Sequence, residues 1–235
     1  MQAFKNYIGG KFVSAKSRNT FETINPANKK VLAHFQDSDK RDVDEAVKSA
    51  KRAFRSWSEV PAPRRGDILF EAASILRKRK SELGKLVTQE MGKVLKEGLG
   101  DVQEAIDTFE YFAGEGRRSF GYTTPSELKD KMCFTVRRPF GVAGLITPWN
   151  FPIAVPSWKI APALVCGNTL VFKPASDAPL CAYRLLEILV EAGIPKGVVN
   201  LVTGSGEKAG SPLAKNPDVR VLSFTGSKAV GEFIT

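Results

Sequence analysis

Four short apolar segments alternate with four helical ones through the second half of the chain, and this rhythm constrains the fold more than any other feature. The expected strands are residues 142–147, 169–173, 198–202 and 219–224, and the expected helices are 153–166, 182–192, 208–214 and a last one from about residue 228. Short apolar strands bounded by Gly and Pro are typical of a parallel sheet that is covered on both faces. Right-handed crossovers between them then give an α/β fold with a Rossmann-like sheet and flanking helices.

The first half of the chain predicts a helical region that serves as scaffold. Apolar residues recur at steps of three and four, so each helix presents one apolar face. Ser38 and Asp39 are both candidate N-caps of the first helix. After a small hairpin over residues 7–13, the first helix is expected to follow its cap and to carry its apolar face over residues 43–57. A second helix is expected from residue 64 towards 82, and a third with its apolar face over residues 95–113.

Residues 117–137 interrupt this pattern. Gly121 and Pro125, with two threonines between them, indicate extended chain and turns. Phe134 and Val136 then alternate with polar residues as in a strand. We therefore expect this segment to leave the main domain.

Composition excludes several classes of function. The net charge is +10, but the basic residues are spread along the chain, and no nucleic-acid-binding motif is present. The single histidine, His34, leaves little room for a zinc site or a Ser-His-Asp triad, so no metal is expected. No apolar run is long enough to span a membrane, and no secretory signal is expected at the N-terminus. Three cysteines without metal spacing suit free thiols in the cytoplasm.

The chain's distinctive residues follow the four expected strands, where a parallel sheet of this kind binds its ligand. The segments are Pro148-Trp149-Asn150-Phe151-Pro152, Lys173-Pro174-Ala175-Ser176, Gly204-x-Gly206-x-x-x-Gly210, and Phe224-Thr225-Gly226-Ser227. The glycine segment misses the usual dinucleotide spacing by one residue, so it also fits an ordinary tight turn. The last segment opens a helix whose free amides can receive a phosphate, although a tight turn explains it equally well.

Taken in order, the first, second and fourth of these segments resemble the aldehyde dehydrogenase superfamily. The resemblance covers essentially the whole chain and is nearest to semialdehyde dehydrogenases, including those that act on 2-oxoglutarate semialdehyde. It implies an aldehyde dehydrogenase fold and the NAD(P)-dependent oxidation of an aldehyde to a carboxylic acid. In this family a cysteine thiolate attacks the aldehyde, hydride passes to NAD or NADP, and a glutamate-activated water releases the acid.

The resemblance assigns roles to individual residues. Asn150 matches the asparagine whose side-chain amide stabilises the oxyanion, and a neutral donor suits that step. Three residues match the lining of the aldehyde tunnel and are expected on one face of the helix after the first strand, although core packing explains Val155 equally well: Phe151, Val155 and Trp158. The cofactor-binding positions are Ile146, Thr147, Pro148, Trp149, Lys173, Ala175, Ser176, Gly206, Gly210, Phe224, Thr225, Gly226 and Ser227.

Two of these positions bear on the choice of cofactor. Lys173 matches the lysine that binds the adenosine ribose, and its ammonium can also favour a nearby phosphate. Ser176 stands where many NAD-preferring members carry a glutamate. A carboxylate there would repel a 2′-phosphate, and serine removes that repulsion. The hypothesis is that the site accepts NADP as well as NAD.

The resemblance also implies catalytic residues that the 235 residues do not contain. The family's nucleophilic cysteine and general-base glutamate lie downstream of the Phe-Thr-Gly-Ser turn, and the chain ends at Thr235. We therefore expect residues 1–116 and 138–235 to form the NAD(P)-binding domain, 117–137 to belong to the oligomerisation domain of a dimer or tetramer, and the catalytic domain to be absent. The expected partner is a small aldehyde. Three alternatives remain open for these residues: a piece of the enzyme without turnover of its own, a non-catalytic binding module, and an inert fragment.

Overall fold

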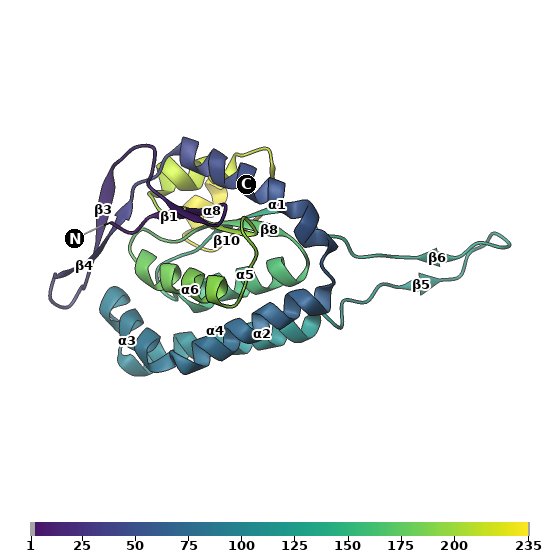
Figure 1. The fold of residues 1–235 in the computed structure, drawn as a ribbon, viewed down its shortest axis with the longest axis horizontal. Helices are drawn as coiled ribbons and strands as arrows, with labels where there is room; N and C mark the ends of the chain where they lie inside the picture. The colour runs from purple at the N-terminus through teal and green to yellow at the C-terminus, as the bar shows by residue number, and fades with distance from the viewer. Residues whose placement is uncertain (1–2, 235) are drawn as a thin grey trace.

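The computed structural model describes residues 3–234, and at its centre lies a six-stranded sheet in the order β10-β7-β8-β9-β1-β2 (Figure 1). Both expected limits of the NAD(P)-binding domain, residues 1 and 235, lie outside the described residues. Four strands run parallel, which confirms the predicted α/β fold: β7 (Val142–Ile146), β8 (Thr169–Lys173), β9 (Val199–Leu201) and β10 (Val219–Phe224). The predicted hairpin is present as β1 (Asn6–Ile8) and β2 (Lys11–Val13), and it extends the sheet antiparallel to β9.

Side chains of the parallel strands alternate between two apolar cores, one on each face of the sheet. Ala143 and Leu145 of β7 join the larger core, whereas Val142 and Ile146 join the smaller one. The larger core is covered by α5 (Ala154–Val165) and α6 (Pro179–Glu191), and the smaller one by α1 (Lys40–Glu59) and α7 (Ser211–Ala214). Burial on both faces explains why these strands are apolar throughout.

The first helix begins where the sequence predicted. Asp39 caps α1 by accepting a hydrogen bond from the backbone N–H of Arg41, and Asp42 completes a capping box. Two short strands that the sequence analysis did not predict precede this helix and form a separate sheet: β3 (Thr20–Ile24) and β4 (Val31–Gln36).

An outer layer of helices packs against α5 and α6: α2 (Ala62–Lys78), α3 (Lys80–Met91) and α4 (Leu95–Glu115). The prediction that the second helix runs on to residue 82 is wrong, because the helix breaks at Arg79 and a separate α3 follows. The break lets α3 pack closely along α4. A Cβ atom on Gly98 would lie 2.5 Å from the carbonyl oxygen of Gly84, so no larger residue fits at this crossing.

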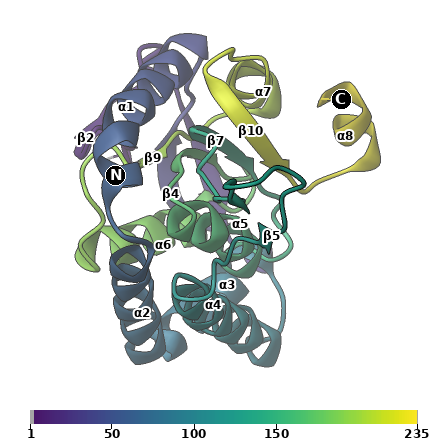
Figure 2. The same ribbon diagram turned by 90° about the vertical axis from the view of Figure 1, so that its right-hand side faces the viewer.

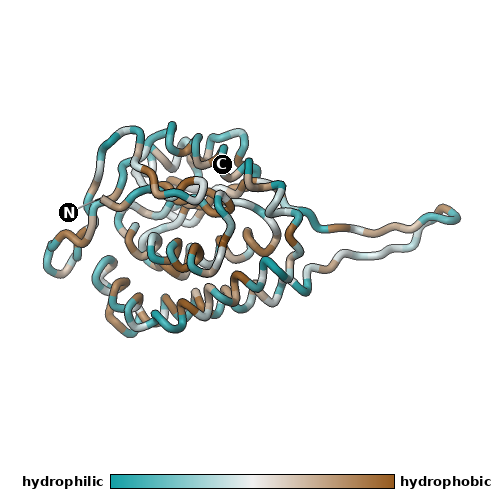
Figure 3. Tube along the Cα trace, in the orientation of Figure 1, coloured by the Kyte–Doolittle hydropathy of each residue, from teal (hydrophilic) through white to brown (hydrophobic). Residues whose placement is uncertain are grey.

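The segment 117–137 leaves the body of the molecule as an extended arm (Figure 1). Its strands are short and pair only with each other: β5 (Thr123–Thr124) and β6 (Cys133–Phe134). Several apolar side chains along the arm are exposed, among them Met132 at 82% and Phe134 at 61%. Figure 3 shows apolar, brown stretches along the arm.

The last two helices frame one edge of the sheet. The helix predicted at 208–214 starts earlier, as a π-helical turn η1 (Gly206–Gly210) that continues into α7. The final helix, α8 (Lys228–Ile234), has no buried residue and lies to the side of β10 (Figure 2). Among residues 3–234, no helix has the length and apolar character needed to cross a membrane.

Candidate functional site

The carboxyl ends of the four parallel strands meet at one edge of the sheet, and the loops that follow them are tied together there. The backbone N–H of Thr147 donates to the carbonyl of Lys173 at 3.3 Å, and that of Thr225 donates to the carbonyl of Ile146 at 3.1 Å. The predicted strand-end residues are therefore neighbours, although Ile146 and Thr225 are 79 positions apart in the sequence.

Two polar groups at this edge lack a hydrogen-bond partner: the ammonium of the largely buried Lys173 and the fully buried hydroxyl of Thr147. Lys173 is 5% exposed, and its ammonium forms no hydrogen bond or ion pair within residues 3–234. Burial lowers the pKa of Lys173 to about 8, against a smaller opposing effect of the Asp177 carboxylate. The buried hydroxyl of Thr147, on the adjacent strand end, also has no hydrogen-bond partner. Unpaired buried polar groups are costly to a fold, so this pair points to a ligand that supplies the missing partners.

The loops after β8 and β9 are joined by a side chain. The hydroxyl of Ser176, which like Ala175 is half-buried, donates to the carbonyl of Gly204 at 2.9 Å. Gly204 has a φ of +146° that favours glycine, whereas Gly206 and Gly210 have no positive φ. The Cβ position of Gly210 lies 3.9 Å from Cδ of Lys173, an ordinary contact distance, so η1 packs beside the lysine side chain.

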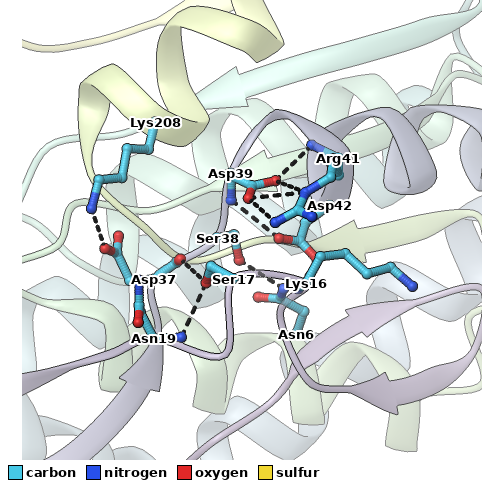
Figure 4. Close-up of polar contacts among 10 residues, drawn as sticks. All are labelled: Asn6, Lys16, Ser17, Asn19, Asp37, Ser38, Asp39, Arg41, Asp42 and Lys208. Carbon is cyan, nitrogen blue, oxygen red and sulfur yellow. Dashed lines mark hydrogen bonds and ion pairs between the residues drawn. The ribbon is translucent and has the colours of Figure 1, made fainter.

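A polar network from the N-terminal part of the chain braces the same loop. The backbone N–H of Ser38 donates to the carbonyl of Thr203 at 3.1 Å. The side-chain amide of Asn6 donates to the Ser38 hydroxyl at 2.8 Å (Figure 4). Lys208 of η1 pairs with Asp37 at 2.6 Å in the same view. The start of η1 is thus fixed from two sides.

The turn after β10 is tight and exposed. A Cβ atom on Gly226 would approach the Phe224 ring to 2.5 Å, so the ring closes over the turn. Ser227 directly precedes α8, and its hydroxyl accepts a hydrogen bond from the Val230 N–H at 3.4 Å. Thr225, Gly226 and Ser227 are all exposed at the same edge as the loop after β7.

The loop after β7 passes from buried to exposed chain. Ile146 and Thr147 are buried, Pro148 is half-buried, and Trp149 and Asn150 are exposed. Within residues 3–234 the side-chain amide of Asn150 makes no hydrogen bond. A free amide donor in an exposed loop is available to a reacting oxygen.

The predicted substrate face needs a correction. Helix α5 begins at Ala154, so Phe151 lies in the loop before it and not on the helix. Trp158 is 46% exposed, but Val155 is only 3% exposed. The three residues therefore do not form one open surface here, and Val155 fits the core-packing alternative.

Charged residues that the sequence analysis did not single out lie beneath the same loop. Asp101 accepts hydrogen bonds from the backbone N–H groups of Ile153 and Ala154 at 3.3 and 2.7 Å. The ammonium of Lys93 lies 3.3 Å from the Asp101 carboxylate and 3.8 Å from the centroid of the Phe151 ring. A signal for this pair was present, because Asp101 is a lone carboxylate within the buried stripe of α4. Buried charges of this kind are usually paired.

The three cysteines are free, and none lies in the loop that carries Asn150. Cys133 is on the exposed arm, and Cys166 follows the far end of α5, about 18 Å from its first residue at the rise of an α-helix. Cys181 is completely buried, and burial together with the Glu90 carboxylate raises the pKa of its thiol well above the usual value. No cluster of three or more His, Cys, Asp or Glu residues suited to a metal ion occurs within residues 3–234.

Comparison with known proteins agrees with this geometry. Residues 12–235 match the model of the aldehyde dehydrogenase family. An alpha-ketoglutarate semialdehyde dehydrogenase of Haloferax volcanii is 45% identical over 231 residues, covering 98% of this chain and 48% of its own. Betaine aldehyde dehydrogenase of Staphylococcus aureus, solved with NAD⁺, superposes with a TM-score of 0.96 at 36% identity, covering 100% of this chain and 48% of its own. A 3,6-anhydro-L-galactose dehydrogenase solved with NADP gives a TM-score of 0.95 at 36% identity, covering 99% and 49% of the two chains. The chain thus spans about half the length of the relatives it matches.

Proposed function

Because the chain belongs to the aldehyde dehydrogenase family, we propose that it serves the NAD- or NADP-dependent oxidation of an aldehyde, preferably a semialdehyde, to a carboxylic acid. The observation that carries this proposal is a pair of unpartnered polar groups at the carboxyl edge of the parallel sheet, the buried hydroxyl of Thr147 and the ammonium of the largely buried Lys173. The semialdehyde class is supported by the name of the archaeal relative. The cofactors of the two solved structures support NAD or NADP.

The residues at this edge fit a dinucleotide. Lys173 offers an ammonium and Thr147 a hydroxyl, each without a partner within residues 3–234, and both suit the oxygen-rich ribose and phosphate groups. Gly226 and Ser227 would face the pyrophosphate, and exposed Trp149 would lie against the cofactor. When bound, the dinucleotide supplies the acceptor for the two electrons removed from the aldehyde.

Asn150 is the one residue to which we assign a catalytic role in this chain. Its side-chain N–H would donate to the aldehyde oxygen, which becomes negatively charged when the carbonyl carbon is attacked. A neutral amide stabilises that charge without changing its own protonation state. The substrate would approach along Phe151 and Trp158, which are both accessible.

We further propose that these 235 residues by themselves bind the dinucleotide but do not oxidise aldehyde. Cys133 on the arm, Cys166 after the far end of α5 and the completely buried Cys181 are poor nucleophiles for a carbonyl held by Asn150. Burial also raises the pKa of Cys166, which reduces its thiolate fraction. Free thiols suit a reducing compartment, so we place the protein in the cytoplasm.

The arm 117–137 is proposed to be the oligomerisation segment. Its strands β5 and β6 pair only with each other, and its apolar side chains, including Phe120 at 69% and Met132 at 82%, are exposed. Exposed apolar side chains next to unpaired strand edges favour association with another copy. The strands of the main sheet and the helical layers would form the NAD(P)-binding domain.

Calorimetric titration of the 235-residue chain with NAD and with NADP, beside an assay for reduced cofactor in the presence of a semialdehyde, tests the proposal. Binding of at least one dinucleotide without turnover is the expected result. Absence of binding to a folded chain would overturn the cofactor site, and turnover would overturn the proposed inactivity.

A further inference from the structure

The loop that carries Asn150 is held by two buried charged residues from the outer helical layer. Asp101 of α4 accepts hydrogen bonds from Ile153 and Ala154, the first N–H groups of α5. Helix α5 has no side-chain cap from its own sequence, so Asp101 takes that place. Lys93 pairs with Asp101 and lies over the ring of Phe151, the residue that follows Asn150.

Both charges are buried, with side-chain exposures of 5% for Lys93 and 0% for Asp101. Buried ion pairs contribute little net stability, because desolvation of the two ions offsets their attraction. Stability of the fold therefore does not explain why this ion pair lies beneath the loop.

A second buried carboxylate in the same layer shows what helix capping alone requires. Glu90 accepts hydrogen bonds from Leu180 and Cys181 at 2.7 Å each and so caps α6, and it also accepts one from Thr23. Glu90 has no cationic partner within residues 3–234. Glu90 thus caps a helix without a lysine beside it. At Asp101 a lysine is present, and what Lys93 adds there is its contact with the Phe151 ring.

We infer that Lys93 and Asp101 are positioning residues for Asn150. The Asn150 amide makes no hydrogen bond within the described chain, so only the backbone on either side sets its orientation. β7 fixes that backbone on one side, and the Lys93–Asp101 pair fixes it on the other. A preorganised donor is what stabilisation of an oxyanion requires. This inference rests on the proposed function for the role of Asn150, but the positioning itself can be measured without cofactor or substrate.

Amide hydrogen exchange of the full 235-residue chain, followed by mass spectrometry, tests the effect on the backbone. Lys93→Met and Asp101→Asn should each speed exchange in residues 149–154 by about tenfold or more, because a buried charged contact is lost. Lys93→Arg keeps a cation over the ring and should stay near the wild-type rate. Glu90→Gln, which removes a helix-capping carboxylate without a lysine partner, should speed exchange most at residues 180–181 and less in residues 149–154 than Asp101→Asn does.

The side-chain amide of Asn150 gives a direct spectroscopic readout. In ¹⁵N-asparagine-labelled chain, with the signal assigned through Asn150→Asp, Lys93→Met should lower the order parameter of this amide, because the backbone that orients it is held less firmly. Lys93→Arg should keep the wild-type value. A folded Lys93→Met variant with unchanged exchange and an unchanged Asn150 order parameter would overturn the inference, as would a Glu90→Gln variant that loosens residues 149–154 as much as Asp101→Asn does. If the wild-type chain binds neither NAD nor NADP while these effects occur, the proposed function fails and the positioning stands.

Discussion

Replacing Lys173 by methionine separates the requirements of the fold from those of the cofactor site. Methionine keeps a long unbranched side chain and removes the buried charge. The pKa of Lys173 is lowered from 10.5 to about 8, and at about 1.4 kcal/mol for each pKa unit the folded chain carries about 3 kcal/mol of destabilisation while the ammonium is charged. We therefore expect Lys173→Met to raise the free energy of unfolding at pH 7 by about 3 kcal/mol.

The sign of the pH dependence follows from the same shift. Below pH 8 the lysine is protonated in both the folded and the unfolded chain, so the destabilisation is complete. Between pH 8 and 10.5 the unfolded chain binds more protons than the folded one, so stability rises with pH. From this residue the wild type should gain about 1.4 kcal/mol between pH 7 and pH 9, and Lys173→Met should lack that gain.

Urea unfolding of wild type and variant at pH 7 and pH 9 measures both effects. Subtracting the change in unfolding free energy of the variant from that of the wild type removes the contributions of other lysines. Lys96→Met, at an exposed position of α4, is the matched control and should change little. The same Lys173→Met chain should bind NAD and NADP about tenfold or more weakly by calorimetry, since a charged hydrogen bond to the ligand is lost. A Lys173→Met chain that is less stable at pH 7, or that keeps the wild-type gain with pH, would refute the reasoning.

Three further changes test other parts of the site and the arm. Ser176→Glu should weaken NADP binding about tenfold or more relative to NAD in paired titrations; strong NAD preference of the wild type under equal conditions would contradict our interpretation of this position. Gly226→Ala places a Cβ 2.5 Å from the Phe224 ring and should lower unfolding stability by about 1–3 kcal/mol, whereas Gly100→Ala, which meets open space in α4, should raise it by about 0.5–1 kcal/mol; similar urea midpoints for the two variants would refute the packing argument. Deleting residues 121–136 should turn an associating chain into a monomer with unchanged helix content, by light scattering and circular dichroism; a wild-type monomer with a sharp two-state melt would count against the arm as an association site.

The parts of the fold that sequence predicts are those fixed by neighbouring residues. Strands buried on both faces are continuously apolar, and so Val142–Ile146 and Thr169–Lys173 are recognisable without the rest of the chain. The cap at Asp39 depends on residues two and three positions away. The order of strands and helices then fixes which loops share an edge, and this placed Asn150 and Lys173 at the same edge.

Other features depend on distant contacts that no local pattern contains. The break at Arg79 reflects the close packing of α3 on α4. The contact of Asp101 with Ile153 and Ala154 spans 52 and 53 positions in the chain. The environment of Lys173 is similar, since a lysine at a strand end is equally consistent with an exposed surface position, and only the packed structure shows its burial.

The buried charges at this edge of the sheet differ in a way that predicts opposite effects on stability. Lys173 has no partner in the described chain, so its removal leaves no group unsatisfied and relieves a desolvation penalty. Asp101 accepts from two N–H groups and from Lys93, so Asp101→Asn weakens three contacts and leaves a buried ammonium without its counter-charge. Lys173→Met should therefore stabilise the chain and Asp101→Asn should destabilise it, although both remove one buried charge. That contrast is expected if Lys173 is held ready for a ligand, whereas Asp101 already has its partners and acts through the loop that carries Asn150.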